Sequence, residues 1–220
     1  MGLMQQIDYL KVKSSARMPE EIKNIMEEAT EKLLNQEIEK NALKTGDQLP
    51  EFKLKNAIGD TINIYELLSK GPLIIIFYRG AWCPYCNLEL RAYQELLPRI
   101  REVGADLVAI SPETPDLSLS LSEKLSIDFE VLSDINNKVA RQLGLVFKLD
   151  DKLISLYKNM GIDLAESQGN ADGELPVPAT YVVGSDGEIL LAYVNSDYTK
   201  RLEPEDALAA ITNNKVSGGL

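Results

Sequence analysis

Residues 77–86 read FYRGAWCPYC, and this stretch contains both cysteines of the 220-residue chain, Cys83 and Cys86. The residues from Leu73 to Tyr78 are continuously apolar and rich in β-branched side chains, a pattern typical of a strand buried on both faces. Residues 87–103 carry apolar side chains at helical spacing and predict an amphipathic helix. The Cys-X-X-Cys pair therefore lies where a central strand ends and a helix begins.

Thiols at such a junction have the chemistry of a reversible redox pair. A cysteine is a nucleophile only as the thiolate, and its free side chain has a pKa of about 8.5. The unpaired N–H groups and the dipole at a helix N-terminus stabilise the anion, and lower the pKa in Cys-X-X-Cys motifs to about 7 or less. Pro84 suits the first helical turn, where its missing N–H costs least. We interpret Cys83 and Cys86 as catalytic thiols rather than as two cysteines that only pack in a core.

The composition excludes several other classes of function. The chain has no histidine, which removes Cys-His and Ser-His catalysis, and its two cysteines cannot form a four-ligand zinc site within one subunit. There is no cluster of metal ligands and no glycine-rich phosphate loop, so neither a metal nor a flavin or nucleotide cofactor is expected. The net charge of −11 and the lack of a basic stripe argue against nucleic acid and anionic membranes as partners.

The chain also lacks the sequence features of a secreted or membrane-spanning protein. Its first residues contain no apolar core of the secretory type, and the longest apolar run, residues 72–77, is far too short to cross a bilayer. We therefore expect a cytoplasmic location. Ordinary thiols stay reduced in that compartment, so the two cysteines are not expected to form a structural disulfide.

The order of predicted elements indicates one α/β domain over residues 46–212, with an N-terminal helical arm over residues 1–45 and a tail, residues 213–220, that we expect to fray. The arm contains one predicted helix, residues 19–44, that packs on the core or serves in dimerisation; packing is the simpler interpretation. We expect residues 145–175 to form an irregular excursion over the surface. The other predicted elements are strands at 52–54, 61–64, 73–78, 105–110, 130–132, 177–183 and 189–194, and helices at 65–69, 87–103, 112–125, 136–143 and 203–211.

Four segments of the chain resemble the peroxiredoxin-like branch of the AhpC/TSA family. They are FYRGAWCPYCNLELRAYQ (77–94), LVAISPETPD (107–116), VLSDINNKVARQLGLVF (131–147) and LPVPATYVV (175–183). The resemblance implies a thioredoxin-like fold, in which helices flank a central mixed β-sheet. It also implies a cis-proline loop at Val177–Pro178 that faces the cysteines, with Pro178 and Thr180 contributing to substrate binding.

The resemblance further implies roles for individual residues. Peroxiredoxins carry a Pro-X-X-X-Thr-X-X-Cys signature after the same strand, and its final cysteine attacks the peroxide. On this chain that cysteine falls on Cys86, the threonine on Cys83 and the proline on Arg79. The later arginine that assists the peroxide oxygens falls near Pro178. Of these family residues only the cysteine is present in this chain, where it forms a thioredoxin-like pair with Cys83.

Several nearby side chains are candidates for supporting roles. Arg79 adds positive charge to the site if it folds back toward the thiols. Trp82 and Tyr85 either pack at the edge of the core or form an apolar rim that receives substrate, and packing is the simpler interpretation. Glu89 lies one turn into the helix and is a candidate proton acceptor, although a glutamate there more often faces solvent. Arg141 is expected to be a surface charge.

Two catalytic mechanisms and one non-catalytic function fit the pair. In the first mechanism Cys86 attacks a hydroperoxide, and its sulfenic acid condenses with Cys83 to a disulfide that thioredoxin or a similar dithiol reduces. In the second, Cys83 attacks a disulfide substrate and Cys86 resolves the mixed disulfide. In the third, the pair is a redox sensor whose disulfide alters an interaction. The family resemblance favours peroxide reduction and is compatible with a homodimer.

Overall fold

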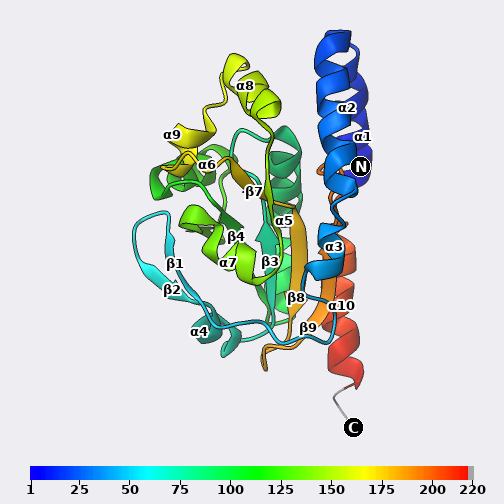
Figure 1. Ribbon diagram of the computed structural model, residues 1–220. Helices are drawn as coiled ribbons and strands as arrows, with labels where there is room; N and C mark the ends of the chain where they lie inside the picture. The colour runs from blue at the N-terminus through cyan, green and yellow to red at the C-terminus, as the bar shows by residue number, and fades with distance from the viewer. Residues whose placement is uncertain (218–220) are drawn as a thin grey trace.

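The computed structural model describes residues 1–217, and over these residues a seven-stranded mixed sheet forms the centre of the molecule (Figure 1). The strand order is β2-β1-β5-β4-β3-β8-β9. Strands β3, β4 and β5 are parallel to one another, whereas β1, β2, β8 and β9 join by antiparallel pairing. The strands are β1 (Lys53–Asn56), β2 (Thr61–Asn63), β3 (Leu73–Phe77), β4 (Asp106–Ser111), β5 (Glu130–Ser133), β8 (Ala179–Val183) and β9 (Ile189–Val194).

Helices cover both faces of this sheet, as expected for the thioredoxin-like fold class. Strand β3 lies near its middle and is buried along its whole length, which confirms the prediction from its continuous apolar run. Ile74 and Ile76 face a core cluster closed by α5 (Pro84–Glu102), α6 (Pro115–Leu125) and α10 (Pro204–Ser217). Ile75 and Phe77 face the opposite cluster, which includes side chains of α4 (Ile64–Leu68) and α7 (Lys138–Gln142).

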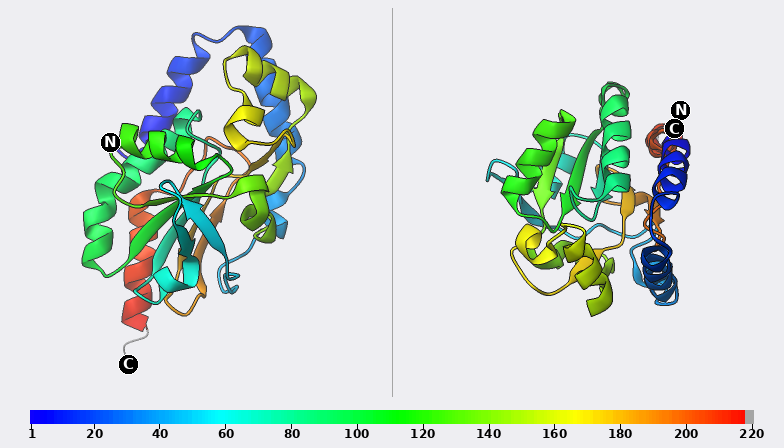
Figure 2. Two further views of the ribbon diagram at one scale, coloured as in Figure 1. Left: turned by 90° about the vertical axis from the view of Figure 1, so that its left-hand side faces the viewer. Right: turned by 90° about the horizontal axis from the view of Figure 1, so that it is seen from above.

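The N-terminal segment forms three helices, α1 (Leu3–Ser15), α2 (Glu20–Leu34) and α3 (Ile38–Asn41), so the single helix expected over residues 19–44 is wrong. The break follows Leu34, where Glu37 adopts a left-handed backbone with φ 52°. Helix α1 was not foreseen. It packs against α5, α2 packs against α8 (Asp151–Asn159), and the two N-terminal helices diverge from the turn that joins them (Figure 2). These contacts favour the packing interpretation of the arm.

The segment 145–175, expected to be irregular, is ordered into β6 (Val146–Lys148), α8, α9 (Leu164–Gln168) and β7 (Glu174–Pro176). Its interior is a third apolar cluster that includes Leu153, Leu156 and Tyr157, at helical spacing on α8. The expectation of irregular structure was wrong because the polar ends of the segment hide this local stripe. Strands β6 and β7 pair with each other in a separate small sheet.

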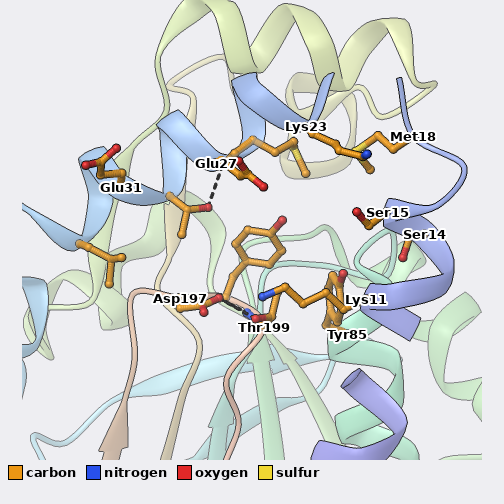
Figure 3. Close-up of a pocket in the computed structure, with 14 residues that line it drawn as sticks. Lys11, Ser14, Ser15, Met18, Lys23, Glu27, Glu31, Tyr85, Asp197 and Thr199 are labelled. Carbon is orange, nitrogen blue, oxygen red and sulfur yellow. Dashed lines mark hydrogen bonds between the residues drawn. The ribbon is translucent and has the colours of Figure 1, made fainter. Parts of the chain in front are cut away.

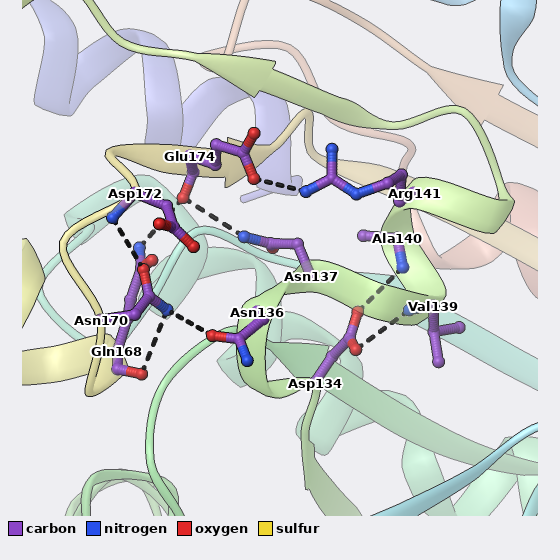
Figure 4. A network of polar contacts seen from close by, with 10 residues as sticks. All are labelled: Asp134, Asn136, Asn137, Val139, Ala140, Arg141, Gln168, Asn170, Asp172 and Glu174. Carbon is purple, nitrogen blue, oxygen red and sulfur yellow. Dashed lines mark hydrogen bonds and ion pairs between the residues drawn. The ribbon is translucent and has the colours of Figure 1, made fainter.

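A network of polar contacts fixes the ordered segment against α7 (Figure 4). The backbone carbonyl of Glu174 accepts hydrogen bonds from the side chains of Asn137 and Gln168, while its carboxylate pairs with Arg141 at 2.5 Å. Asn137 belongs to a short 3₁₀ turn, Ile135–Asn137, and Asp134 accepts the N–H groups that open α7. Arg141 is thus a surface charge, as predicted, and does not reach the cysteines.

Two expectations about the C-terminal third are also corrected. No cis peptide bond occurs within the described residues, so the Val177–Pro178 bond is trans and the expected cis-proline is wrong. The N–H of Val177 donates to the carbonyl of Leu145 and keeps this approach to β8 extended. Helix α10 runs past Ile211 to Ser217, beyond the start of the tail expected to fray, and residues 218–220 lie outside the described part.

Among the described residues, no helix is both long and apolar enough to cross a membrane.

Candidate active site

Cys83 and Cys86 lie side by side at the junction predicted from the sequence. Cys83 is the N-cap residue of α5 and Pro84 is its first helical residue. The N–H of Asn87 donates to the carbonyl of Cys83 and starts the helix. The two Sγ atoms are 2.8 Å apart, with both thiols reduced and with exposed fractions of 1% and 0%. A short movement of either side chain would bring the sulfurs to bonding distance.

The turn between β3 and α5 needs glycine at position 80. Gly80 has φ +147°, and its carbonyl accepts the N–H of Cys83 at 3.1 Å. A Cβ atom on Gly80 would lie 2.4 Å from Nε1 of Trp82 and 2.8 Å from Oε1 of Glu113. The next residue, Ala81, donates its N–H to Oε2 of Glu113 at 2.7 Å. The turn is thereby held against the segment that follows β4.

Arg201, in the segment between β9 and α10, approaches Cys86 directly. Its Nη2 atom lies 3.4 Å from Sγ of Cys86, and its Nε atom donates to Oε2 of Glu89 at 2.6 Å. Backbone carbonyls of Tyr198 and Lys200 accept bonds from Nη1. Glu89 is fully buried, so the expectation that it faces solvent is wrong; its place on the inner face of α5, opposite Arg201, is the reason. Arg201 was missed by the sequence analysis.

Arg79 is a second buried arginine beside the pair. Its guanidinium carbon lies 4.4 Å from the ring centroid of Tyr198, 4.7 Å from that of Trp82 and 5.7 Å from that of Tyr157. Nη2 donates to the hydroxyl of Tyr157 at 2.5 Å. Within the described residues no carboxylate pairs with Arg79, and its Nε atom makes no hydrogen bond. The negative charge that best compensates this buried cation is a cysteine thiolate.

The surrounding charges shift the pKa values of the two thiols in opposite directions. Burial acts to raise the pKa of Cys83, but the hydrogen bond from Cys86 and the positive charges of Arg79 and Arg201 lower it to about 6. Burial and the neighbouring Cys83 raise the pKa of Cys86 well above its usual range, although both arginines act against this. The pair therefore gives up one proton readily and holds the second. At neutral pH it carries a single negative charge shared across a 2.8 Å contact.

Two buried carboxylates, Glu89 and Glu113, also contribute to the electrostatics of the site. Burial raises the pKa of Glu89 to about 7, against the lowering effect of Arg201. Burial also raises the pKa of Glu113 to about 7, where the N–H of Ala81 lowers it and Cys86 raises it further. Glu89 has an arginine partner and Glu113 has none in the described chain. Glu113 lies in the segment LVAISPETPD (107–116) that resembles the family, but the sequence analysis gave it no role because it follows a different strand from the one that precedes the cysteines.

The other predicted site residues are distributed around this centre. Trp82 and Tyr85 are half-buried, and the Tyr85 ring packs edge-on against Tyr198 at 5.7 Å between centroids. Pro178 lines a small cavity of about 20 Å³ together with Arg79. Thr180 is inside β8, between β3 and β9, and donates to Glu89 at 3.5 Å. Its backbone is therefore already paired and offers no edge for an added strand.

Two grooves lead toward the site from opposite sides. One, of about 400 Å³, lies between α1 and α2 and reaches Tyr85, Asp197 and Thr199 (Figure 3). The other, of about 380 Å³, is lined by Trp82 and Glu113 together with residues of the 161–167 segment. The sulfurs themselves remain covered. This arrangement admits a small oxidant more readily than a protein surface.

Comparisons of this sequence with known proteins point to one family. The family described as the AhpC/TSA family matches residues 45–192. A putative peroxiredoxin of Mycobacterium tuberculosis is 27% identical over 169 residues, which are 77% of this chain and 96% of the relative. Peroxiredoxin Bcp of Escherichia coli K12 is 28% identical over 105 residues, 48% of this chain and 67% of the relative.

Solved structures of proteins with related names have a similar fold. The crystal structure of peroxidoxin BcpB from Mycobacterium tuberculosis superimposes with a TM-score of 0.62 at 25% identity, covering 78% of this chain and 97% of the other. A cysteine-to-serine mutant of PrxQ from Xylella fastidiosa has a TM-score of 0.60 at 14% identity, covering 80% of this chain and 98% of the other. At 14% identity, the similarity to the Xylella fastidiosa structure shows a shared fold and nothing more.

Proposed function

Because the chain belongs to the AhpC/TSA family, we propose that it reduces hydroperoxides with Cys83 and Cys86, which alternate between dithiol and disulfide. It is a thiol peroxidase of the peroxiredoxin type. The observation that carries the proposal is the contact of two reduced sulfurs, 2.8 Å apart, beside two buried arginines. Such an arrangement supplies a thiolate and a resolving thiol in one place.

In the first step Cys86 attacks the peroxide. Its proton passes to Cys83 along the contact between the sulfurs, and Arg201, 3.4 Å from Sγ of Cys86, stabilises the thiolate that forms. The sulfur takes the distal oxygen with its hydrogen and becomes a sulfenic acid, while the O–O bond breaks and the leaving oxygen takes up one proton to depart as an alcohol or water. Arg79 lies beside the same sulfurs and stabilises the negative charge that develops on the leaving oxygen.

In the second step Cys83 attacks the sulfenic sulfur, water leaves and the disulfide forms. A thioredoxin-like dithiol then returns the pair to its reduced state, and a reducing compartment such as the cytoplasm provides one. Trp82, Tyr85, Pro178 and Thr180 surround this chemistry, and we assign to them the shaping of the substrate cavity.

A second function, thiol–disulfide exchange, is favoured by one observation. The pKa of Cys83 falls to about 6, and this thiol is the N-cap residue that attacks disulfides in thioredoxin-like chemistry. In that mechanism Cys83 forms the mixed disulfide and Cys86 resolves it. The covered sulfurs favour the small peroxide over a protein disulfide.

Single serine variants separate the two functions. With hydroperoxide, Cys86→Ser is expected to lose the first oxidation, because the attacking sulfur is gone. Cys83→Ser is expected to stop at a sulfenic acid that a dimedone-type probe traps. The measurement is rapid mixing with peroxide followed by intact mass of the trapped adduct.

The opposite pattern, an adduct in Cys86→Ser only, would make Cys83 the attacking residue. Reduced wild-type protein that peroxide leaves untouched, while a disulfide substrate oxidises it, would replace the peroxidase with the exchange function. A pair that titrates with redox buffer and turns over neither substrate would identify a redox sensor.

A further inference from the structure

Glu113 is a buried carboxylate that the proposed steps leave without a role. Its exposed fraction is 1%, and within residues 1–217 it has no lysine or arginine partner. The N–H of Ala81 donates to Oε2 at 2.7 Å, but Oε1 has no hydrogen-bond donor of its own among the described contacts. A buried carboxylate without a cation is costly as an anion, so its surroundings favour the neutral form.

The surroundings of Glu113 couple it to the cysteines. The charge of Glu113 acts to raise the pKa of Tyr78, which follows β3, and a negative charge on Cys86 of α5 acts to raise the pKa of Glu113. Its Oε1 atom and Nε1 of Trp82 crowd the same side of Gly80. Asp163 and Glu166 lie farther out in the groove that Glu113 lines, so no positive charge of this groove neutralises it.

The proposed chemistry needs one proton that the cysteine pair does not hold. At neutral pH the reduced pair is one thiolate and one thiol. Its oxidation by a hydroperoxide gives a disulfide, an alcohol and water, and the atoms and charges balance only if one further proton is consumed. Reduction of the disulfide by a dithiol, back to thiolate and thiol, releases one proton. Some group must exchange this proton with the site in each cycle.

We propose that Glu113 is that group: it gives its proton to the leaving oxygen on oxidation and regains one on reduction. The inference rests on the proposed peroxidase cycle. In the reduced protein one negative charge sits on the sulfurs and Glu113 is neutral. In the oxidised protein the sulfurs are neutral and Glu113 carries the charge. The total charge of the buried groups, which include the sulfurs, Glu113, Arg79, Arg201 and Glu89, therefore stays constant through the cycle.

Glu89 is less suited to this exchange, although it is equally buried. It is bound at 2.6 Å by Arg201, which favours its charged form in both redox states. A negative charge on Cys86 raises the pKa of both carboxylates, but Glu113 has no arginine partner that favours its charged form. Burial raises the pKa of Glu113 to about 7, the charge of Cys86 adds to this once Cys86 becomes the attacking thiolate, and disulfide formation removes that charge. The pKa of Glu113 then falls as the pair is oxidised, which releases its proton when it is needed.

Trp82 reports this titration, since it is the only tryptophan of the chain and its Nε1 atom and Oε1 of Glu113 both approach the Cβ position of Gly80. In reduced wild-type protein we expect a fluorescence step near pH 7, separate from the step of the thiol pair near pH 6. Glu113→Gln, which keeps an acceptor for the Ala81 N–H, should abolish the step. Glu166→Gln, on the rim of the same groove, is the matched control and should retain it. A step that persists in Glu113→Gln, or that vanishes only in Glu89→Gln, overturns the inference.

Proton stoichiometry gives a readout that a structural role would not move. In weakly buffered solution with an indicator dye, wild-type and Glu166→Gln protein should take up almost no solvent proton as the disulfide forms. Glu113→Gln should take up close to one proton per disulfide, because its own donor is missing. Equal uptake in all three proteins overturns the inference. Diamide oxidation of the same samples consumes the same proton and tests Glu113 even if peroxide fails to oxidise the wild type, a result that would count against the peroxidase alone.

Discussion

At the scale of single residues, the thiol chemistry depends on how buried charges are compensated. Among the described residues, two buried arginines lie beside the thiols, and only Arg201 has a carboxylate partner, Glu89. The unbalanced positive charge is satisfied when the cysteine pair loses a proton, which is why the pKa of Cys83 falls to about 6 although burial opposes it. The redox pair is therefore activated by its core neighbours as much as by the N-terminus of α5.

Arg201→Met tests this compensation. Loss of the positive charge raises the pKa of Cys83, so the pH midpoint of thiolate absorbance should move up by about 1 pH unit or more. At pH 7 the variant would then be alkylated more slowly by iodoacetamide. Glu89 is left buried without its partner, which should lower the free energy of unfolding in urea by about 3 to 5 kcal/mol.

Arg141→Met is the matched control, because Arg141 is an exposed arginine paired with Glu174 away from the thiols. It should leave the midpoint unchanged. If Arg201→Met titrates at the wild-type pH, the role given to Arg201 is wrong.

At the scale of elements, the turn between β3 and α5 sets the place of the thiols. Gly80→Ala introduces a Cβ that meets both Trp82 and Glu113, at a φ of +147° that is strained for alanine. We expect a loss of about 1 to 3 kcal/mol in the free energy of unfolding and a shifted Trp82 emission, both measured in a urea titration. Gly59→Ala is a useful comparison, since it also has positive φ but nothing within 4 Å of its Cβ position. Equal losses in the two variants would show that close contact at Gly80 is unimportant.

Helix α1 is the second element near the site. Its residues line one groove with Tyr85 and another with Pro84 and Asn87 of α5, so we expect it to limit the access of a protein partner to the cysteines. Its start is fixed by Glu203, whose carboxylate accepts the N–H groups of Leu3 and Met4 at 2.9 Å each. Glu203→Ala removes these bonds and should cost about 1 kcal/mol. Hydrogen exchange of the α1 amides should speed up, and the oxidised pair should be reduced faster by a protein dithiol.

Glu205→Ala, at the first turn of α10, removes an exposed ion pair with Arg99 and serves as the control. Unchanged α1 exchange in Glu203→Ala would rule out this anchoring of the helix.

At the scale of the whole molecule, the sequence predicted what local patterns determine. The buried strand β3, the Cys-X-X-Cys at the start of α5 and the alternation of strands and helices all carry short-range signals, and the structure confirms them. Contacts between distant segments carry no such signal. Tyr157 meets Arg79 across 78 positions and Arg201 meets Cys86 across 115, so neither was identified from spacing.

The errors have the same origin. The segment 145–175 was taken as irregular because its polar ends concealed a cluster that is completed by residues of α2 and by Trp82. The cis-proline followed from the family resemblance, in which the position of the later arginine falls near Pro178, so that pattern offered no arginine at the thiols. The structure instead has a trans bond there, and a different arginine, Arg201, reaches the sulfur.

The central claim is that Cys83 and Cys86 form one disulfide when a hydroperoxide oxidises the protein. Intact mass and thiol titration of reduced protein after an equimolar addition of hydroperoxide test it most directly. The account predicts a loss of about 2 Da with both thiols gone, and full recovery of both with a dithiol. A protein that keeps both thiols, or gains oxygen mass on one cysteine while the other stays free, would contradict it.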